Sequence, residues 1–177
     1  MIMEDLSLHI LDVVENSTRA GAKKIKVEIH EDLKEDSLRI EITDDGKGMD
    51  AGMLEKALDP FYTTKTVRKV GLGLSLLREA AREANGDLTI QSEIGKGTRV
   101  KVTFQHSHID RKPMGDMTKT MITLIIGNPE VHFLYLYNKD GRKYRMIDTE
   151  KLKAKGNLSS ISTGELIHLV KKSLKEI

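Results

Sequence analysis

Residues 38–48 read LRIEITDDGKG, and this stretch decides the fold. Apolar and polar residues alternate from 38 to 42, which predicts a strand with one buried face. The strand runs into a loop in which Gly46 and Gly48 let the backbone turn tightly and approach a flat ligand. Asp44 enters that turn, where its carboxylate could accept a hydrogen bond from an exocyclic amine of the kind adenine carries. Taken alone, such a pattern is usually only a turn.

Composition limits the classes of protein to which the chain can belong. Its 177 residues are 38% hydrophobic and 32% charged, which suits one globular domain, or one domain with an appendage. A net charge of +2 argues against nucleic acid as a partner, and the lack of cysteine excludes disulfides and thiolate metal sites. We find neither a signal peptide nor a stretch near the roughly 20 apolar residues of a membrane span. We therefore expect a cytoplasmic protein with no membrane partner.

Hydrophobic periodicity predicts the order of helices and strands along the rest of the chain. Helices are expected over residues 5–20, 51–58, 72–85 and 117–127, and after a capping box at 162–165. Strands are expected over residues 25–30, 38–42, 88–92, 98–104, 131–137 and 142–148. A change in composition near residues 106–112 suggests a linker. We therefore predict a main domain, 1–108, and a C-terminal extension, 109–177, made of a helix, a β-hairpin and a helix.

The first predicted helix carries a polar stripe on an otherwise apolar surface. The stripe comprises, at spacings of four, three, four and three, Asp5, His9, Asp12, Asn16 and Arg19. On a buried helix such a stripe needs a polar object to face, and a phosphate chain with a divalent cation would serve. Asn16 offers an oxygen suited to Mg²⁺, Arg19 can bind phosphate oxygens, and Asp12 could polarise a water. The alternative is a solvated stripe with a Glu15–Arg19 surface pair.

Two further segments could face phosphates or a base. Residues 71–75, GLGLS, place backbone N–H groups at a helix N-terminus, but match neither the Walker pattern nor the dinucleotide fingerprint. The preceding loop, residues 61–70, holds three cations, including Lys65, and could be a lid over a triphosphate or an exposed connection. Residues 95–98, GKGT, form either a plain hairpin or a turn that presents the hydroxyl of Thr98 to a base.

In their order and spacing these segments resemble the GHKL superfamily, which includes DNA gyrase, the ninety-kilodalton heat-shock chaperone, histidine kinases and MutL. The resemblance rests on Asn16, the Asp-x-Gly-x-Gly of residues 44–48, the FYTTK of residues 61–65, GLGLS and GKGT, and covers roughly residues 5–105. The short lid is closest to the histidine-kinase branch. The resemblance implies an α+β fold, the Bergerat two-layer sandwich, with helices on one face of a mixed, mostly antiparallel sheet. The C-terminal extension would add a small α/β unit.

The resemblance also implies a site for ATP and Mg²⁺. Asn16 is similar to the Mg²⁺ ligand of the family, and Asp44 to its adenine-binding carboxylate, supported by Thr98. The other residues that the resemblance places around the nucleotide are Arg19, Gly46, Gly48, Met49, Lys65, Gly71, Leu72, Gly73 and Leu74.

Two departures from the family pattern limit the activity expected. Hydrolysing members carry a Glu four residues before the Asn, whereas Asp12 is shorter by about 1.5 Å, which weakens the expectation of hydrolysis. Glu15 points about 100° away on the helix and is a poor substitute base. Few residues precede the first helix, so we expect a stand-alone chain without a phospho-acceptor dimerisation domain. We interpret His9 as a histidine that lines the site or packs in the core, and expect any acceptor on another chain.

Three functions therefore remain open. The first is a stand-alone kinase or ATPase that acts on a His or Ser of a protein partner, similar to the small anti-sigma serine kinases; Asp12 would orient the acceptor. The second is a nucleotide-dependent binding switch with little turnover. The third, a MutL- or gyrase-type clamp, fits least, because the lid is short and no transducer domain of adequate size follows. The extension, 109–177, is expected to pack on the nucleotide domain, or to form a homodimer or partner surface.

Overall fold

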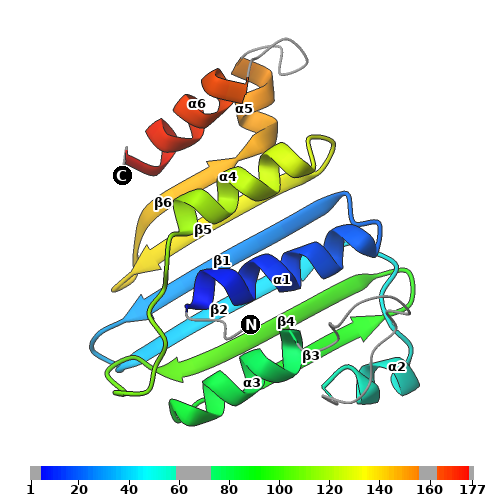
Figure 1. The fold of residues 1–177 in the computed structure, drawn as a ribbon, viewed down its shortest axis with the longest axis vertical. Coiled ribbons are helices and arrows are strands. Elements are labelled where there is room, and N and C mark those ends of the chain that lie inside the picture. The colour runs from blue at the N-terminus through cyan, green and yellow to red at the C-terminus, as the bar shows by residue number, and fades with distance from the viewer. Residues whose placement is uncertain (1–4, 59–72, 156–162, 176–177) are drawn as a thin grey trace.

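A computed structural model describes residues 5–58, 73–155 and 163–175 of the chain (Figure 1). The helices are α1 (Leu6–Arg19), α2 (Ala51–Lys56), α3 (Gly73–Glu83), α4 (Met117–Gly127), α5 (Thr149–Lys155) and α6 (Thr163–Lys175). The strands are β1 (Lys24–Asp32), β2 (Ser37–Asp44), β3 (Leu88–Glu93), β4 (Gly97–Gln105), β5 (His132–Lys139) and β6 (Arg142–Asp148). Across these ranges no helix is long and apolar enough to cross a membrane.

The strands form one sheet in the order β3-β4-β2-β1-β5-β6. All neighbouring strands are antiparallel except β1 and β5, which run parallel. Helices α1, α3 and α4 lie over the same face of this sheet, and α6 lies at its β6 edge, in contact with β6 and α4 (Figure 1). The predicted fold class, helices on one face of a mixed and mostly antiparallel sheet, is therefore confirmed.

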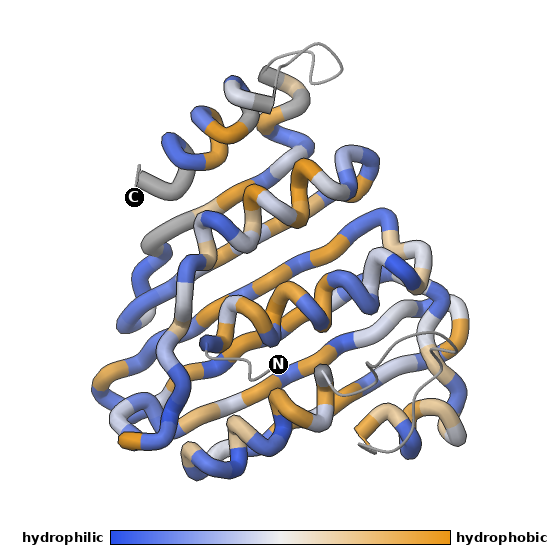
Figure 2. Tube along the Cα trace, viewed as in Figure 1, coloured by the Kyte–Doolittle hydropathy of each residue, from blue (hydrophilic) through white to orange (hydrophobic). Residues whose placement is uncertain are grey.

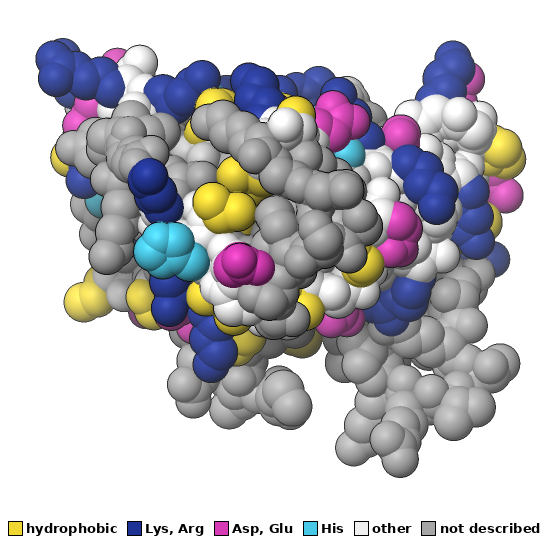
Figure 3. Space-filling model, turned by 90° about the horizontal axis from the view of Figure 1, so that it is seen from above, with side chains coloured by type: hydrophobic (Ala, Val, Ile, Leu, Met, Phe, Trp, Pro, Cys, Tyr) yellow, Lys and Arg dark blue, Asp and Glu magenta, His cyan; other side chains and the backbone are white. Residues whose placement is uncertain are grey.

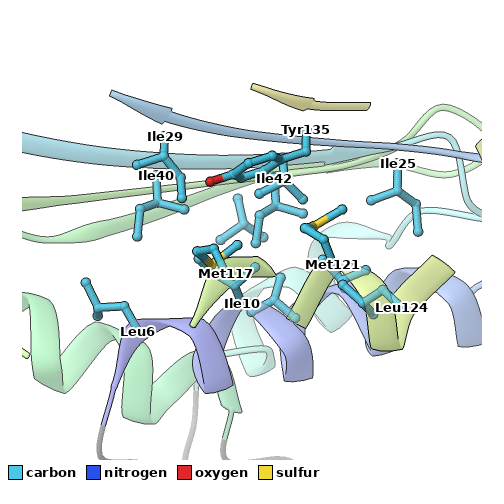
Figure 4. Close-up of a cluster of buried hydrophobic side chains, with 14 of the residues drawn as sticks. Leu6, Ile10, Ile25, Ile29, Ile40, Ile42, Met117, Met121, Leu124 and Tyr135 are labelled. Carbon is cyan, nitrogen blue, oxygen red and sulfur yellow. The ribbon is translucent and has the colours of Figure 1, made fainter. Parts of the chain in front are cut away.

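Alternation of apolar and polar residues decides which face of the sheet the helices cover. Along β1 and β2 every second residue is buried, and hydrophobic and hydrophilic residues alternate visibly along these strands (Figure 2). Side chains from α1 and α4 point into the same layer (Figure 4). The labelled core residues there include Leu6, Ile10, Ile25, Ile29, Ile40, Ile42, Met121 and Leu124, all of them at most 2% exposed. Each side chain of this size stabilises the fold by about 1.5–3 kcal/mol when fully buried.

Residues beyond 108 contribute to the same sheet and the same core. Ile25 of β1 lies opposite Phe133 of β5, and Phe133 is fully buried. Helix α5 was not expected from the sequence. It begins after Asp148, whose carboxylate accepts hydrogen bonds from the backbone N–H groups of Glu150 and Lys151 at 3.2 and 3.4 Å. The final helix begins at Thr163, within the predicted capping box.

Charge is mixed on the surface that Figure 3 shows from above. Both Lys and Arg and, more scattered, Asp and Glu side chains lie there, in keeping with the small net charge of +2.

Candidate functional site

The end of β2 holds a buried carboxylate. Strand β2 ends at Asp44, two residues beyond the predicted end at residue 42, so Asp44 belongs to the strand and not to the loop. Its side chain is buried, with the residue 8% exposed. Its Oδ2 accepts a hydrogen bond from Ser17 Oγ at 2.6 Å, and its Oδ1 accepts one from the Gly46 N–H at 2.9 Å. A carboxylate offers about four acceptor positions, so two donors leave room for a further one. The arrangement can therefore receive an amine from a ligand.

The loop after Asp44 is held by the elements on both sides. Oδ1 of Asp45 accepts from the N–H groups of Lys23 and Lys24 at 2.8 Å each, and Lys47 N–H donates to the Ala20 carbonyl at 3.0 Å. Gly48 has a φ of +68°, and a Cβ there would lie 2.0 Å from the Glu93 carbonyl oxygen. Only glycine permits this conformation and this approach.

A row of hydroxyl groups continues from Asp44 across the sheet. Thr98 of β4 lies opposite both Asp44 of β2 and Ser92 of β3. The Oγ atoms of Ser92 and Thr98 are 2.8 Å apart, and Ser92 Oγ accepts from the Met49 N–H at 2.9 Å. The structure thus brings together the predicted residues Asp44, Gly46, Gly48, Met49 and Thr98.

Sequence reasoning missed Ser17 and Ser92. Ser17 lies on the sheet-facing side of α1, four residues after Val13, and is 5% exposed. A polar residue on the apolar side of a buried helix needs a partner, so its position on the helical wheel was a usable signal. Ser92 had no such signal, because only the strand register brings it to Thr98.

The polar stripe of α1 meets the start of α3. A Cβ built on Gly73 would lie 1.6 Å from Oδ2 of Asp12, so the glycine segment abuts this carboxylate. Asp12 and Asn16 are half-buried, and Oδ2 of Asp12 is buried without a hydrogen-bond partner in the part of the chain described. Gly73 is the first residue of α3, and the partly buried side chain of Leu74 packs against the core.

Arg19, by contrast, lies on the surface with Glu15. Its guanidinium is 3.5 Å from the Glu15 carboxylate, and the two side chains are 46% and 53% exposed. This is the surface pair considered as the alternative reading of the stripe. The described residues do not include the predicted lid, residues 61–70 with Lys65. They also do not include Gly71 and Leu72, the first two residues of the glycine segment.

His9 is the most buried polar residue of the stripe, at 1% exposure. Burial, and secondarily the positive charge of Lys112, lower the pKa of His9 to about 4, while Asp5 opposes the shift. The imidazole is therefore neutral near pH 7. The interpretation of His9 as a buried histidine agrees with this environment.

Comparison with known proteins identifies the family to which the sequence is similar. The family described as "Histidine kinase-, DNA gyrase B-, and HSP90-like ATPase" matches residues 3–108. Sensor kinase CckA of Brucella abortus is 43% identical over 89 residues, 49% of this chain and 9% of that protein. Sensor protein kinase FleS of Pseudomonas aeruginosa is 38% identical over 89 residues, 50% of this chain and 22% of that protein. The chain thus spans less than a quarter of either relative.

Solved structures share a larger part of the fold than the residues that the family match covers. The Aquifex aeolicus MutL ATPase domain complexed with ADP superposes with a TM-score of 0.51 and 19% identity, covering 86% of this chain and 68% of that one. The N-terminal domain of a DNA repair protein gives a TM-score of 0.56 and 19% identity, covering 82% and 53%. The family match covers residues 3–108, which is a smaller share of the 177 residues than the 82% and 86% that superpose on these two structures. The common fold therefore includes part of residues 109–177. The chain belongs to the family of histidine kinase-, DNA gyrase B- and HSP90-like ATPases.

Proposed function

We propose that the chain binds ATP with Mg²⁺ and acts as a histidine-kinase-like kinase or ATPase toward a protein partner. The observation that carries the proposal is the buried carboxylate of Asp44, which Ser17 and Gly46 hold in place while part of its acceptor capacity is unused. A buried charge persists only where it is hydrogen-bonded, and its free acceptor positions favour a ligand that donates. The 6-amino group of adenine is such a donor.

Residues of the polar stripe of α1, beside Ser17, fit the polyphosphate of the same ligand. Asn16 offers a carbonyl oxygen, the type of atom that Mg²⁺ prefers. The Asp12 carboxylate, whose Oδ2 has no partner in the part of the chain described, has acceptor positions to spare for a water or a hydroxyl group brought to the site. Gly73 opens α3 close to Asp12, where any larger residue would displace the carboxylate. ATP would supply the phosphoryl group, and Asp12 would orient its acceptor.

Arg19 and Lys65 are proposed to reach phosphate when nucleotide is bound. Arg19 would first leave Glu15, and an exposed ion pair of this kind contributes at most about 1 kcal/mol. A phosphate charge can therefore displace it. Residues 1–108 would form the nucleotide domain, and residues 109–177 a surface for the partner or for a second copy. We place the protein in the cytoplasm as part of this proposal.

A nucleotide-dependent switch is the second candidate, and the short reach of Asp12 favours it. Such a switch would bind ATP and alter its affinity for a partner without turnover. Incubation with labelled ATP and magnesium, alone and with candidate partners, separates the two. Phosphate release, or label on a partner, indicates the enzyme, whereas tight binding with neither indicates the switch.

Calorimetry tests the nucleotide site itself. We expect the intact chain to bind Mg·ATP and ADP more tightly than GDP, because guanine carries no 6-amino group. Asp44→Asn should weaken ADP binding about 10- to 100-fold, the range expected for losing a hydrogen bond to a charged acceptor. Ser17→Ala should weaken it less, because the carboxylate remains but loses one of its two donors.

Asp50→Asn is the matched control for Asp44→Asn. Asp50 is exposed and is the N-cap of α2. Because Asn caps helices as well as Asp does, ADP binding should not change in Asp50→Asn. Equal ADP affinity in Asp44→Asn and in the unaltered chain would overturn the proposed site.

A further inference from the structure

Three buried side-chain atoms lack a hydrogen-bond partner within residues 5–58, 73–155 and 163–175. They are both ring nitrogens of His9 and Oδ2 of Asp12. Leaving a buried polar group unpaired lowers the stability of the fold. Other buried polar groups on α1 are paired: Ser17 Oγ binds Asp44, and Ser7 Oγ donates to Asp5 at 2.7 Å. The two unpaired residues share the polar stripe of α1 and need a common explanation.

Helix geometry brings the two side chains to the same turn. His9 and Asp12 are three residues apart on α1, a spacing at which side chains are neighbours. Because Cα–Cβ bonds tilt toward the N-terminus of a helix, the Cα–Cβ bond of Asp12 is directed toward the turn that contains His9. Gly73 closes the opposite side, since even a Cβ there would lie within 1.6 Å of Asp12 Oδ2. The carboxylate thus has little room to move away from α1.

The chemistry of the two groups is complementary. The pKa of His9 is lowered to about 4, so near pH 7 one ring nitrogen carries a hydrogen that can be donated. Oδ2 of Asp12 is an acceptor without a donor. Asp5, the other carboxylate near His9, already receives hydrogen bonds from Ser7 Oγ and from the Leu8 N–H at 3.1 Å. Asp5 therefore serves as the N-cap of α1, and Asp12 is the carboxylate that still needs a donor.

We propose that His9 is a positioning residue for Asp12: in the nucleotide-bound state its imidazole donates a hydrogen bond to Oδ2 of Asp12. The inference rests on the proposed function, in which Asp12 orients the phosphoryl acceptor. A carboxylate one methylene shorter than glutamate has less reach, and a fixed orientation offsets part of that loss. Misplacing a reacting group by about 1 Å can slow a reaction by up to about a hundredfold.

The direct test follows the His9 side chain by NMR. The ¹⁵N and ¹H shifts of the imidazole are recorded with and without Mg²⁺ and a non-hydrolysable ATP analogue. We expect one ring N–H to shift downfield and exchange more slowly on binding, and expect Asp12→Ala to abolish the change. Calorimetry on the same samples reports nucleotide binding independently. No binding would contradict the proposed function, whereas binding without a response of His9 would overturn only the positioning role.

Kinetics of two His9 variants give a second readout. His9→Leu keeps the volume but removes the donor, and should lower kcat for phosphate release about tenfold with an unchanged KM for ATP. His9→Gln keeps an N–H donor of similar reach and should retain most of the rate.

A purely structural His9 would give the opposite pattern. His9→Leu would then retain kcat, or both variants would lose rate and folding stability together. The NMR result decides the question even where turnover is too slow to measure.

Discussion

Burial separates the polar side chains of α1 into two groups. Ser17 and His9 are at most 5% exposed, whereas Arg19 pairs with Glu15 in solvent. Ser17 is satisfied by Asp44, so its burial stabilises both the fold and the carboxylate. His9 has no such partner, and its burial lowers its pKa instead. The same helix thus combines groups that stabilise the protein with one whose burial opposes stability.

The pKa of His9 predicts a pH dependence of folding. In the unfolded chain histidine titrates near 6.5, and in the folded chain His9 titrates near 4. Between these values the unfolded state binds more protons, so the free energy of unfolding falls as the pH drops through this window. The loss attributable to His9 is at most about 3–4 kcal/mol, because its pKa falls from 6.5 to about 4 and each pKa unit corresponds to about 1.36 kcal/mol.

Urea denaturation between pH 4.5 and 7.5 measures this loss, and His9→Leu isolates it. We expect a flatter profile in the variant, and a higher stability at pH 5 than in the unaltered chain. Carboxylates with lowered pKa, such as Asp87 and Asp148, lose their contribution at lower pH in both proteins and cancel in the comparison. Parallel profiles would contradict the assignment.

At the level of elements, the N-terminus of α1 is capped by a distant part of the chain. The N–H groups of Leu6 and Ser7 donate to the carbonyls of Pro113 and Met114, both at 2.9 Å. The first turn of a helix has no internal partners for these groups, so the segment before α4 satisfies them. It thereby connects the predicted extension to the helix that carries Asp12 and Asn16.

Gly115 lets this segment approach α1 so closely. Its φ is +78°, and a Cβ there would lie 2.4 Å from the Asp5 side chain and 2.6 Å from Ser7 Oγ. Gly115→Ala should therefore lower the free energy of unfolding by more than the 1–2 kcal/mol or so that a left-handed conformation alone costs. Thermal and urea unfolding would measure the difference.

Gly141→Ala is the matched control for Gly115→Ala. Its φ is +75°, but nothing lies within 4 Å of the added Cβ. Gly141→Ala should lower the free energy of unfolding only by the cost of the left-handed conformation. Equal losses in the two variants would mean that the contact between Gly115 and α1 is unimportant for stability.

At the level of the whole molecule, one sheet crosses the predicted boundary at residue 108. Strand β5 pairs with β1 along its whole length, and Phe133, Tyr135, Met121 and Leu124 are buried against the shared core. Removal of these four side chains alone would forfeit several kcal/mol of burial, comparable to the 5–15 kcal/mol or so by which domains are stable.

We therefore expect a chain ending at residue 108 to lose cooperative folding. It would keep Asp5 but lack the carbonyls of Pro113 and Met114 that accept from the first turn of α1, and it would expose one edge of β1. A chain ending at residue 155 keeps β5, β6 and α4. Among the residues whose burial is described, it loses Val170 and Leu169 from the core, so it should remain folded at lower stability. Circular dichroism melts of both chains would check this. A cooperative transition in the shorter chain would show that residues 1–108 are stable alone.

Much of the fold and of the site could be predicted from local patterns. Alternation identified the six strands to within a few residues, and helical spacing identified α1, α3, α4 and α6. The aspartate and glycines of residues 44–48 were recognisable because a tight turn restricts which residue types it accepts. Thr98 could be added through the resemblance. These features depend on neighbours in sequence, so the sequence by itself determined the family, the fold class and the part of the candidate site around Asp44.

The remaining features depend on contacts between distant segments. Only the register of β2, β3 and β4 brings Ser92 to Thr98, and only packing of α3 on α1 places Gly73 against Asp12. The pairing of β5 with β1 and the capping of α1 by residues 113 and 114 likewise join segments about 100 residues apart. Such contacts minimise exposed apolar surface and unpaired backbone groups over the whole chain at once. That global requirement is why tertiary structure alone decided that His9 is buried and that Arg19 lies on the surface.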